Sequence, residues 1–343
     1  MTIPQIVSWL VSAVSFGTVI MYGCIGETID QKAGGLNLGV PGVMQIGGIA
    51  ALASAFLYES NTASPNPFVA LLLCLCSTLI ASALAGLLYS FLTVSLKVNQ
   101  NVTGLTLTIF GTGIANFFGG NMMKLSGGVG TIYVAVTSNA FRAKIPFLSN
   151  STDPFSLVFL SHGWMVYLAL ILAFAVQYFL DHTRTGLNLR SVGENPATAD
   201  AAGINVTRYK YLASVIGSMI CGLGGLFYVM DYIKGTWAND SAIEALGWLA
   251  VSLVIFTSWK TKNATWGAYL FGLFYWAYIY IPADISRYLA EKMKLQRITY
   301  MQNLYKMLPY ILTIVVLCFV SHRKKRENQA PASLGLSYFR EER

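Results

Sequence analysis

Charged side chains are scarce in this sequence. Only 11% of the 343 residues are Asp, Glu, Lys or Arg, against about 25% in typical soluble domains, and 55% are hydrophobic. A soluble protein cannot bury that much apolar surface, whereas a lipid bilayer can solvate it. The net charge of +8 does not indicate nucleic acid binding, because the cations lie between apolar segments and at the C-terminus instead of forming a basic face.

Residues that carry catalytic or metal chemistry are also few. His162, His182 and His322 lie at separate boundaries of apolar segments and lack the spacing of metal ligands. The sequence has no G-x-x-x-x-G-K-[ST] phosphate loop, and Gly111-Thr-Gly113 and Gly128-Val-Gly130 lack the third glycine of a dinucleotide site. All five cysteines lie inside apolar runs, which is typical of buried, inert thiols. We therefore expect no catalytic, metal or cofactor site, and a membrane enzyme is the weaker class.

Long apolar runs make up most of the chain. A helix needs roughly 20 apolar residues to cross a bilayer, and the runs here predict an all-α, polytopic integral membrane protein with about nine transmembrane helices. The first run is too long for the apolar part of a signal peptide. The expected spans are residues 5–25, 40–58, 68–94, 101–118, 161–181, 209–232, 242–258, 264–282 and 305–321.

The positive-inside rule predicts the orientation of these spans. We place the basic run His322–Arg326 in the cytoplasm and alternate backwards along the chain. The connections that then face the cytoplasm, together with the tail, hold most of the 23 Lys and Arg residues, and the N-terminus lies outside. Residues 1–325 are expected to form the transmembrane domain, and the polar residues 326–343 a disordered cytoplasmic tail. The cytoplasmic connections are 26–39, 95–100, 182–208 and 259–263.

Small residues recur at helical spacing in the sixth expected span. Gly217, Cys221 and Gly225 form one stripe, and Ser214, Ser218 and Gly222 form the next. Such stripes let membrane helices approach closely. They predict tight packing, either within the bundle or at a subunit interface.

The longest cytoplasmic connection, residues 182–208, is a polar island in this apolar chain. Asn195 is a candidate N-cap, Pro196 suits the first helical position, and Gly203 suits a left-handed C-cap. The helix between them is less than about two turns long, and a helix that short is unstable alone in water. Its small side chains favour insertion into a groove on another protein, although it could instead simply close the loop.

Five motifs resemble the permease subunits of ATP-binding-cassette (ABC) importers of the branched-chain amino acid and simple-sugar type. The resemblance is closest to the nucleoside and simple-sugar permeases that work with basic-membrane-protein lipoproteins. It covers residues 15–320 in matching order. The motifs are Ala33-Gly-Gly-Leu-Asn-Leu-Gly39, Asn99–Gly113, Gly193-Glu-Asn-Pro196, Ala199-Asp-Ala-Ala-Gly-Ile204 and Met307-Leu-Pro-Tyr-Ile-Leu312.

The resemblance implies a set of partners. ATP would be used by a separate ATPase with two nucleotide-binding domains, which moves the short capped helix and thereby the spans. The resemblance also implies a second, related permease subunit in a heterodimer, an extracytoplasmic substrate-binding lipoprotein, and a bacterial cytoplasmic (inner) membrane. The expected ATPase-coupling residues are Gly193, Glu194, Asn195, Pro196, Ala199, Asp200, Ala201, Ala202 and Gly203.

The solute implied by the resemblance is a nucleoside or a simple sugar, and a vitamin such as riboflavin is an alternative. The chain has Gly39-Val-Pro-Gly42 where the family has Gly-Leu-Glu-Gly, a departure that bears on the identity of the solute more than on the transport role. An ion-coupled transporter is disfavoured, because it needs an ionisable residue at mid-membrane and Asp231, Asp240 and Glu244 fall at span ends. An uncharged solute calls for hydroxyl and amide groups along its path. The candidates are Asn37, Asn101, Thr103, Thr106 and Asn116.

Overall fold

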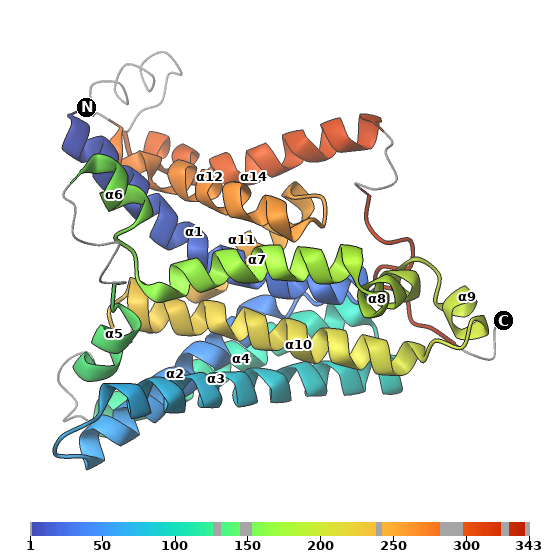
Figure 1. Ribbon diagram of the computed structural model, residues 1–343, viewed down its shortest axis with the longest axis horizontal. Coiled ribbons are helices and arrows are strands. Elements are labelled where there is room, and N and C mark those ends of the chain that lie inside the picture. Colours follow the sequence, from blue (N-terminus) through green and yellow to red (C-terminus); the bar gives the residue numbers. More distant parts are fainter. Residues whose placement is uncertain are drawn as a thin grey trace.

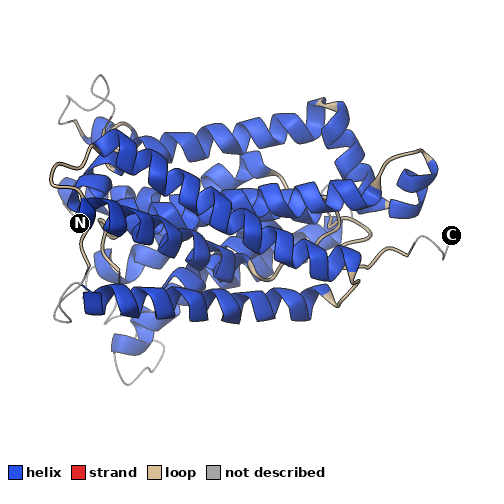
Figure 2. Ribbon diagram, turned by 90° about the horizontal axis from the view of Figure 1, so that it is seen from below, coloured by secondary structure: helices blue, strands red, loops and turns tan. Residues whose placement is uncertain are grey.

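The computed structural model describes residues 2–125, 132–144, 153–237, 242–281, 298–323 and 329–339. Within these ranges the chain is helical, apart from loops and two isolated β-bridges. Figures 1 and 2 show the long helices running side by side along the molecule. In chain order the elements are α1 (Ile3–Lys32), α2 (Val40–Asn61), α3 (Pro67–Ser90) with the π-helical turn η1 (Phe91–Ser95), α4 (Gln100–Leu125), α5 (Ala135–Phe141), α6 (Pro154–Phe159), α7 (Trp164–His182), α8 (Arg184–Glu194), α9 (Pro196–Ala201), α10 (Val206–Phe227) with the π-helical turn η2 (Tyr228–Tyr232), α11 (Ala242–Phe256), α12 (Thr261–Tyr280) and α14 (Ile298–Arg323).

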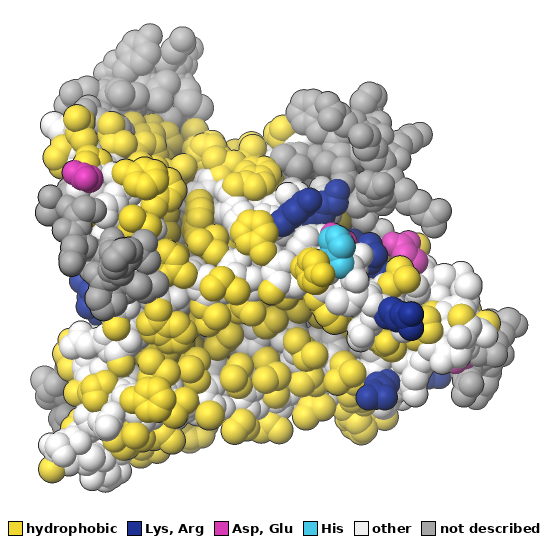
Figure 3. Space-filling view, in the orientation of Figure 1, with side chains coloured by type: hydrophobic (Ala, Val, Ile, Leu, Met, Phe, Trp, Pro, Cys, Tyr) yellow, Lys and Arg dark blue, Asp and Glu magenta, His cyan; other side chains and the backbone are white. Residues whose placement is uncertain are grey.

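Six helical segments are long and apolar enough to cross a membrane, which makes the chain a multi-pass membrane protein. The apolar helix α11 is shorter, at 15 residues. Figure 3 shows that hydrophobic side chains cover the middle of one face, while Lys and Arg gather toward the end that carries α8 and α9. The six segments are Ile3–Lys32, Val40–Asn61, Pro67–Ser95, Gln100–Met122, Trp164–His182 and Val206–Tyr232.

The central helix of the bundle is α10, which packs against α1, α2 and α3. A Cβ atom added to Gly217 would lie 2.6 Å from the Gly26 carbonyl oxygen of α1, and one added to Gly225 would overlap the Met44 carbonyl oxygen of α2. A Cβ atom on Gly222 would overlap the Ser82 hydroxyl of α3. The small-residue stripes of α10 therefore lie inside the bundle, and the predicted close packing is confirmed.

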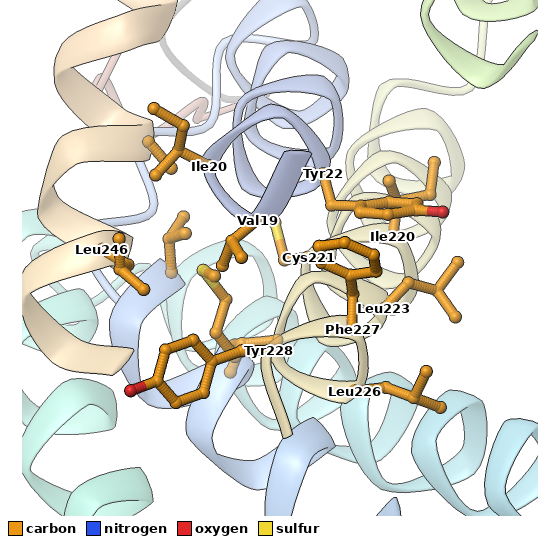
Figure 4. Close-up of a cluster of buried hydrophobic side chains, with 14 of the residues drawn as sticks. Val19, Ile20, Tyr22, Ile220, Cys221, Leu223, Leu226, Phe227, Tyr228 and Leu246 are labelled. Carbon is orange, nitrogen blue, oxygen red and sulfur yellow. The ribbon is translucent and has the colours of Figure 1, made fainter. Parts of the chain in front are cut away.

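Large side chains fill the space between these backbones. Val19 and Tyr22 of α1 meet Phe227 and Tyr228 at the end of α10 in a buried cluster (Figure 4). The Tyr22 and Phe227 rings lie 6.3 Å apart, and the Tyr22 hydroxyl donates a 2.7 Å hydrogen bond to the carbonyl oxygen of Met165 in α7. Because lipid is as apolar as these side chains, dispersion contacts and such hydrogen bonds hold the helices together.

The first helix is longer than expected. The sequence places residues 26–39 in a cytoplasmic connection, but α1 continues to Lys32 and buries Glu27 and Asp30, which are 1% and 3% exposed. The expected boundary at residue 25 is therefore wrong. Hydropathy alone assigns charged residues to loops, whereas here Ser214 donates to one carboxylate oxygen of Asp30, and Gln31 and the Asn37 amide donate to Glu27.

The segment 331–339, which we name the strap, packs against the helical bundle (Figure 1, dark red, beside α8). This differs from the disordered tail expected for residues 326–343, of which the structure describes 329–339. Pro331 and Ser333 are buried, and Leu334 packs on the main core. The tail is polar on average, but it contains single apolar residues, and their burial stabilises the packed strap.

Candidate functional site

The polar island folds into two short helices at one end of the molecule. The predicted caps of α9 are confirmed: the Asn195 side chain accepts a 3.0 Å hydrogen bond from the Thr198 amide, and Gly203 has a φ of +84°. The Ile204 amide donates to the Ala199 carbonyl oxygen at 3.0 Å, which closes the C-terminal turn. No atom lies within 4 Å of a Cβ built on Gly203, so only its backbone conformation requires glycine there.

Helix α8, which precedes α9, was missed by the sequence analysis. Thr183 caps it by accepting a 3.0 Å hydrogen bond from the Gly186 amide. Gly186, Leu189, Val192 and Gly193 are buried on one side of the helix. This spacing of three and four residues was the available signal, but two of the four positions are glycines, which leaves Leu189 and Val192 as its large apolar side chains.

The residues predicted for coupling divide between two sides of this segment. Ala201, Ala202 and Gly203 are exposed, as are Glu194 and Asn195. Small exposed side chains on a capped helix form a narrow ridge that another protein can approach closely.

Two of the predicted coupling residues face their own chain instead. Ala199 is 3% exposed and packs with Val192 and Val206. Gly193 is buried, and a Cβ atom there would overlap the Lys32 carbonyl oxygen at the end of α1. These two residues seat α8 and α9 on the bundle, so a partner can contact only the opposite side of α9.

A buried polar network connects this end of the molecule to the spans, and the sequence analysis missed it. Asp30 of α1 accepts a hydrogen bond from the Ser214 hydroxyl of α10. Glu27 accepts from Gln31 at 2.7 Å and from the Asn37 amide at 3.2 Å. The Ser214 bond joins α10 to α1 and the Asn37 bond joins the α1–α2 connection to α1, whereas the Gln31 bond lies within α1. These three parts of the chain are therefore linked by buried hydrogen bonds.

The Gln31 side chain extends this network toward α12. Its Oε1 accepts a 2.6 Å hydrogen bond from the Trp259 indole, in the connection between α11 and α12. Trp259 has a φ of +55°, in the left-handed region that non-glycine residues rarely adopt. The network therefore ties α1 to α10 and to the α11–α12 connection.

The predicted pathway residues do not form one site. Thr103 and Thr106 line a small cavity of about 180 Å³ with apolar side chains of α3 and α4. Their hydroxyls donate 2.8 Å hydrogen bonds to the carbonyl oxygens of the residues four positions earlier, Asn99 and Val102. Asn37 is buried elsewhere, where its Oδ1 accepts from the Gly39 amide at 2.8 Å and shapes the bend before α2.

The outer face of α4 is exposed and mixes polar with apolar residues. Asn101, Thr106 and Asn116 are exposed on this helix. Ile109 and Phe117, which are 74% and 63% exposed, are the largest apolar contributors. An amide such as Asn116 is costly against lipid hydrocarbon, so this face suits protein or water better than acyl chains.

Comparison with known proteins agrees with the motifs. The family model described as "Branched-chain amino acid transport system / permease component" matches residues 9–317. TsgC13 of Haloferax volcanii, whose name assigns it provisionally to a glucose ABC transporter as a permease, is 30% identical over 76% of this chain and 74% of its own. The nucleoside ABC transporter permease NupC of Lactococcus lactis is 26% identical over 95% and 94%, and the guanosine ABC transporter permease NupQ of Bacillus subtilis is 27% identical over 100% of both chains. No solved structure matches significantly.

The family match covers most of the chain and confirms the resemblance carried by its motifs. Permease components of ABC transporters are transport subunits without a catalytic domain. The chain therefore belongs to the family of permease components of branched-chain amino acid transport systems.

Proposed function

We propose that this chain is the membrane-spanning permease subunit of an ABC importer for a nucleoside or a simple-sugar-type solute. The observation that carries the proposal is the family match over residues 9–317, combined with the capped, exposed helix α9. The solute class is supported by two relatives whose names specify nucleosides or guanosine and that align over nearly the whole chain.

In this proposal α9 is the coupling helix, which inserts its exposed side into a groove of a partner ATPase. The ATPase has two nucleotide-binding domains, and their closure moves α8 and α9 together with the start of α10. The buried bond between Ser214 and Asp30 then transmits the displacement to α1. A rigid, capped element is suited to this role because a frayed loop would absorb the movement.

The full topology has nine spans in this proposal. The nine are the six long apolar segments and the helices α11, α12 and α14. The protein lies in a bacterial inner membrane, with its N-terminus outside and its C-terminus in the cytoplasm. The gathering of Lys and Arg at the end that carries α8 and α9 supports a cytoplasmic location for that end (Figure 3).

Two further partners belong to the proposal. A second, related permease subunit covers the outer face of α4, so that Asn101, Thr106 and Asn116 line a path for the solute between the two subunits. An extracytoplasmic binding lipoprotein delivers the solute to the opposite end from α9. The exposed amide of Asn116, on a helix that is long and apolar enough to span a membrane, supports the first of these assignments.

The experiment that tests the proposed function is uptake by the native complex reconstituted in lipid vesicles. The complex is purified through a tag on this chain, loaded with its binding protein, and supplied with ATP inside the vesicles. We expect ATP-dependent uptake of radiolabelled guanosine or glucose, with an excess of the unlabelled solute competing. Competition by riboflavin alone would contradict the solute class, and uptake without ATP would contradict the ABC mechanism.

A further inference from the structure

The strap begins on the segment that precedes α9. The Ser333 hydroxyl and the Ser333 amide both donate to the Gly193 carbonyl oxygen, the amide at 3.0 Å. The Gly335 amide donates to the Gly34 carbonyl oxygen at 3.1 Å. These bonds fix the start of the strap to the end of α8 and to the α1–α2 connection.

The second part of the strap is tied to two other elements. The Leu336 carbonyl oxygen accepts hydrogen bonds from the Lys210 ammonium of α10 at 3.3 Å and from the Gln100 side chain at 3.4 Å. The Lys97 ammonium lies 4.2 Å from the centre of the Phe339 ring, a cation–π contact. The strap therefore joins the α3–α4 connection to α10.

The strap reaches α9 itself through Tyr338. The Tyr338 hydroxyl donates a 2.9 Å hydrogen bond to Oδ2 of Asp200, and its ring packs on the buried cluster that includes Ala199. Asp200 and Tyr338 both line a cavity of about 640 Å³, so the packing around α9 is incomplete on this side. Helix α9 has only six residues, and a helix that short is unstable alone in water. Beside the buried side chain of Ala199, this hydrogen bond is a second contact that holds its C-terminal turn.

We infer that the strap positions α9 for the partner ATPase, and that Tyr338 is a positioning residue that acts through Asp200. The inference rests on the proposed function, because it specifies what holds the coupling helix in place. When the bond to Tyr338 is lost, α9 samples orientations that the ATPase groove does not accept. The apparent affinity for the ATPase is then the intrinsic affinity multiplied by the fraction of molecules in which α9 is correctly oriented.

The test measures how tightly the partner ATPase is retained by the full-length permease. The probe is the ATPase that co-purifies with tagged native permease, titrated onto Tyr338→Phe, Asp200→Ala and the double variant in lipid nanodiscs. We expect Tyr338→Phe to weaken retention by about three- to tenfold, which is within the usual net contribution of one intramolecular hydrogen bond. The double variant is expected to match Asp200→Ala alone, because both substitutions remove the same bond.

Two controls separate positioning from general stability. Ser337→Ala also removes one hydroxyl from the strap, from the residue next to Tyr338, and is expected to retain the ATPase normally. The thermal unfolding midpoint of the permease without ATPase is expected to be the same for Tyr338→Phe and the native chain. A lowered midpoint with unchanged ATPase retention would show a merely structural bond and overturn the inference.

Ala201→Trp, on the exposed side of α9, separates this inference from the proposed function. If Ala201→Trp prevents ATPase retention while Tyr338→Phe has no effect, or if the Tyr338 and Asp200 effects add, the strap does not position α9. If Ala201→Trp retains the ATPase normally, α9 is not the docking element, and the proposed coupling role and the inference both fail.

Discussion

Gly26 of α1 and Gly217 of α10 lie back to back. A Cβ atom added to either residue would collide with the carbonyl oxygen of the other, at 2.6 Å in the case of Gly217. This backbone contact lies next to the buried hydrogen bond between Ser214 and Asp30. Helices α1 and α10 therefore contact each other through their backbones, with little room for adjustment.

Replacing one of these two glycines by a larger residue is expected to destabilise the fold. Gly217→Leu forces α1 and α10 apart, and overpacking of this kind costs about 1–3 kcal/mol. The measurement is the thermal unfolding midpoint of the purified permease in detergent, which is expected to fall. Gly113→Leu is the matched control, because no atom lies within 4 Å of a Cβ at that position in α4. An equal loss of stability in both variants would contradict the packing described here.

The left-handed conformation of Gly203 at the end of α9 can be tested by substitution. Gly203→Val leaves packing untouched but places a β-branched residue at a φ of +84°, at a cost of roughly 1–2 kcal/mol. We expect normal membrane insertion with reduced ATP-driven uptake in reconstituted vesicles. Gly203→Asn is expected to keep most of the uptake, since asparagine tolerates the left-handed conformation. Equal uptake for Val and Asn would show that the cap conformation is unimportant.

The proposed topology predicts the accessibility of single cysteines. In a chain without its native cysteines, Asn195→Cys and Lys260→Cys are expected to be shielded from impermeant thiol reagents in intact cells. Asn150→Cys is expected to react, although Asn150 lies outside the described residues. Asn61→Cys, at the exposed C-terminal end of α2, is the corresponding position within them. Reaction of Asn195→Cys from outside would reverse the orientation.

The helices could be predicted from the sequence better than their connections. Apolar runs identified the long helices, and Asn195 and Gly203 identified α9, because caps are local signals. The burial of Glu27 and Asp30 could not be predicted, since it depends on tertiary contacts. Ser214, which donates to Asp30, is 184 residues away in sequence, and the Asn37 amide reaches Glu27 only because the chain bends before α2. For the same reason the strap was taken for a disordered tail.

The pathway residues differ in what their substitution is expected to do. Thr103 is buried with its hydroxyl bonded to the Asn99 carbonyl oxygen, so Thr103→Val is expected to change uptake by less than about twofold. Thr106→Val and Asn116→Ala alter the exposed face of α4 and are expected to raise the KM for the solute. Initial rates of uptake against solute concentration measure this. Unchanged kinetics in all three variants would remove this face from the pathway.

Coupled turnover of Ala201→Trp tests the central claim most directly. Ala201 is exposed on α9, and an indole there blocks close approach without disturbing the buried side formed by Ala199. Ser60→Trp, exposed at the far end of α2, is the control. ATP hydrolysis and solute uptake are measured together in vesicles that contain the reconstituted complex. The account predicts that Ala201→Trp abolishes uptake and solute-stimulated hydrolysis while Ser60→Trp retains both. Normal coupled hydrolysis and uptake by Ala201→Trp would contradict it.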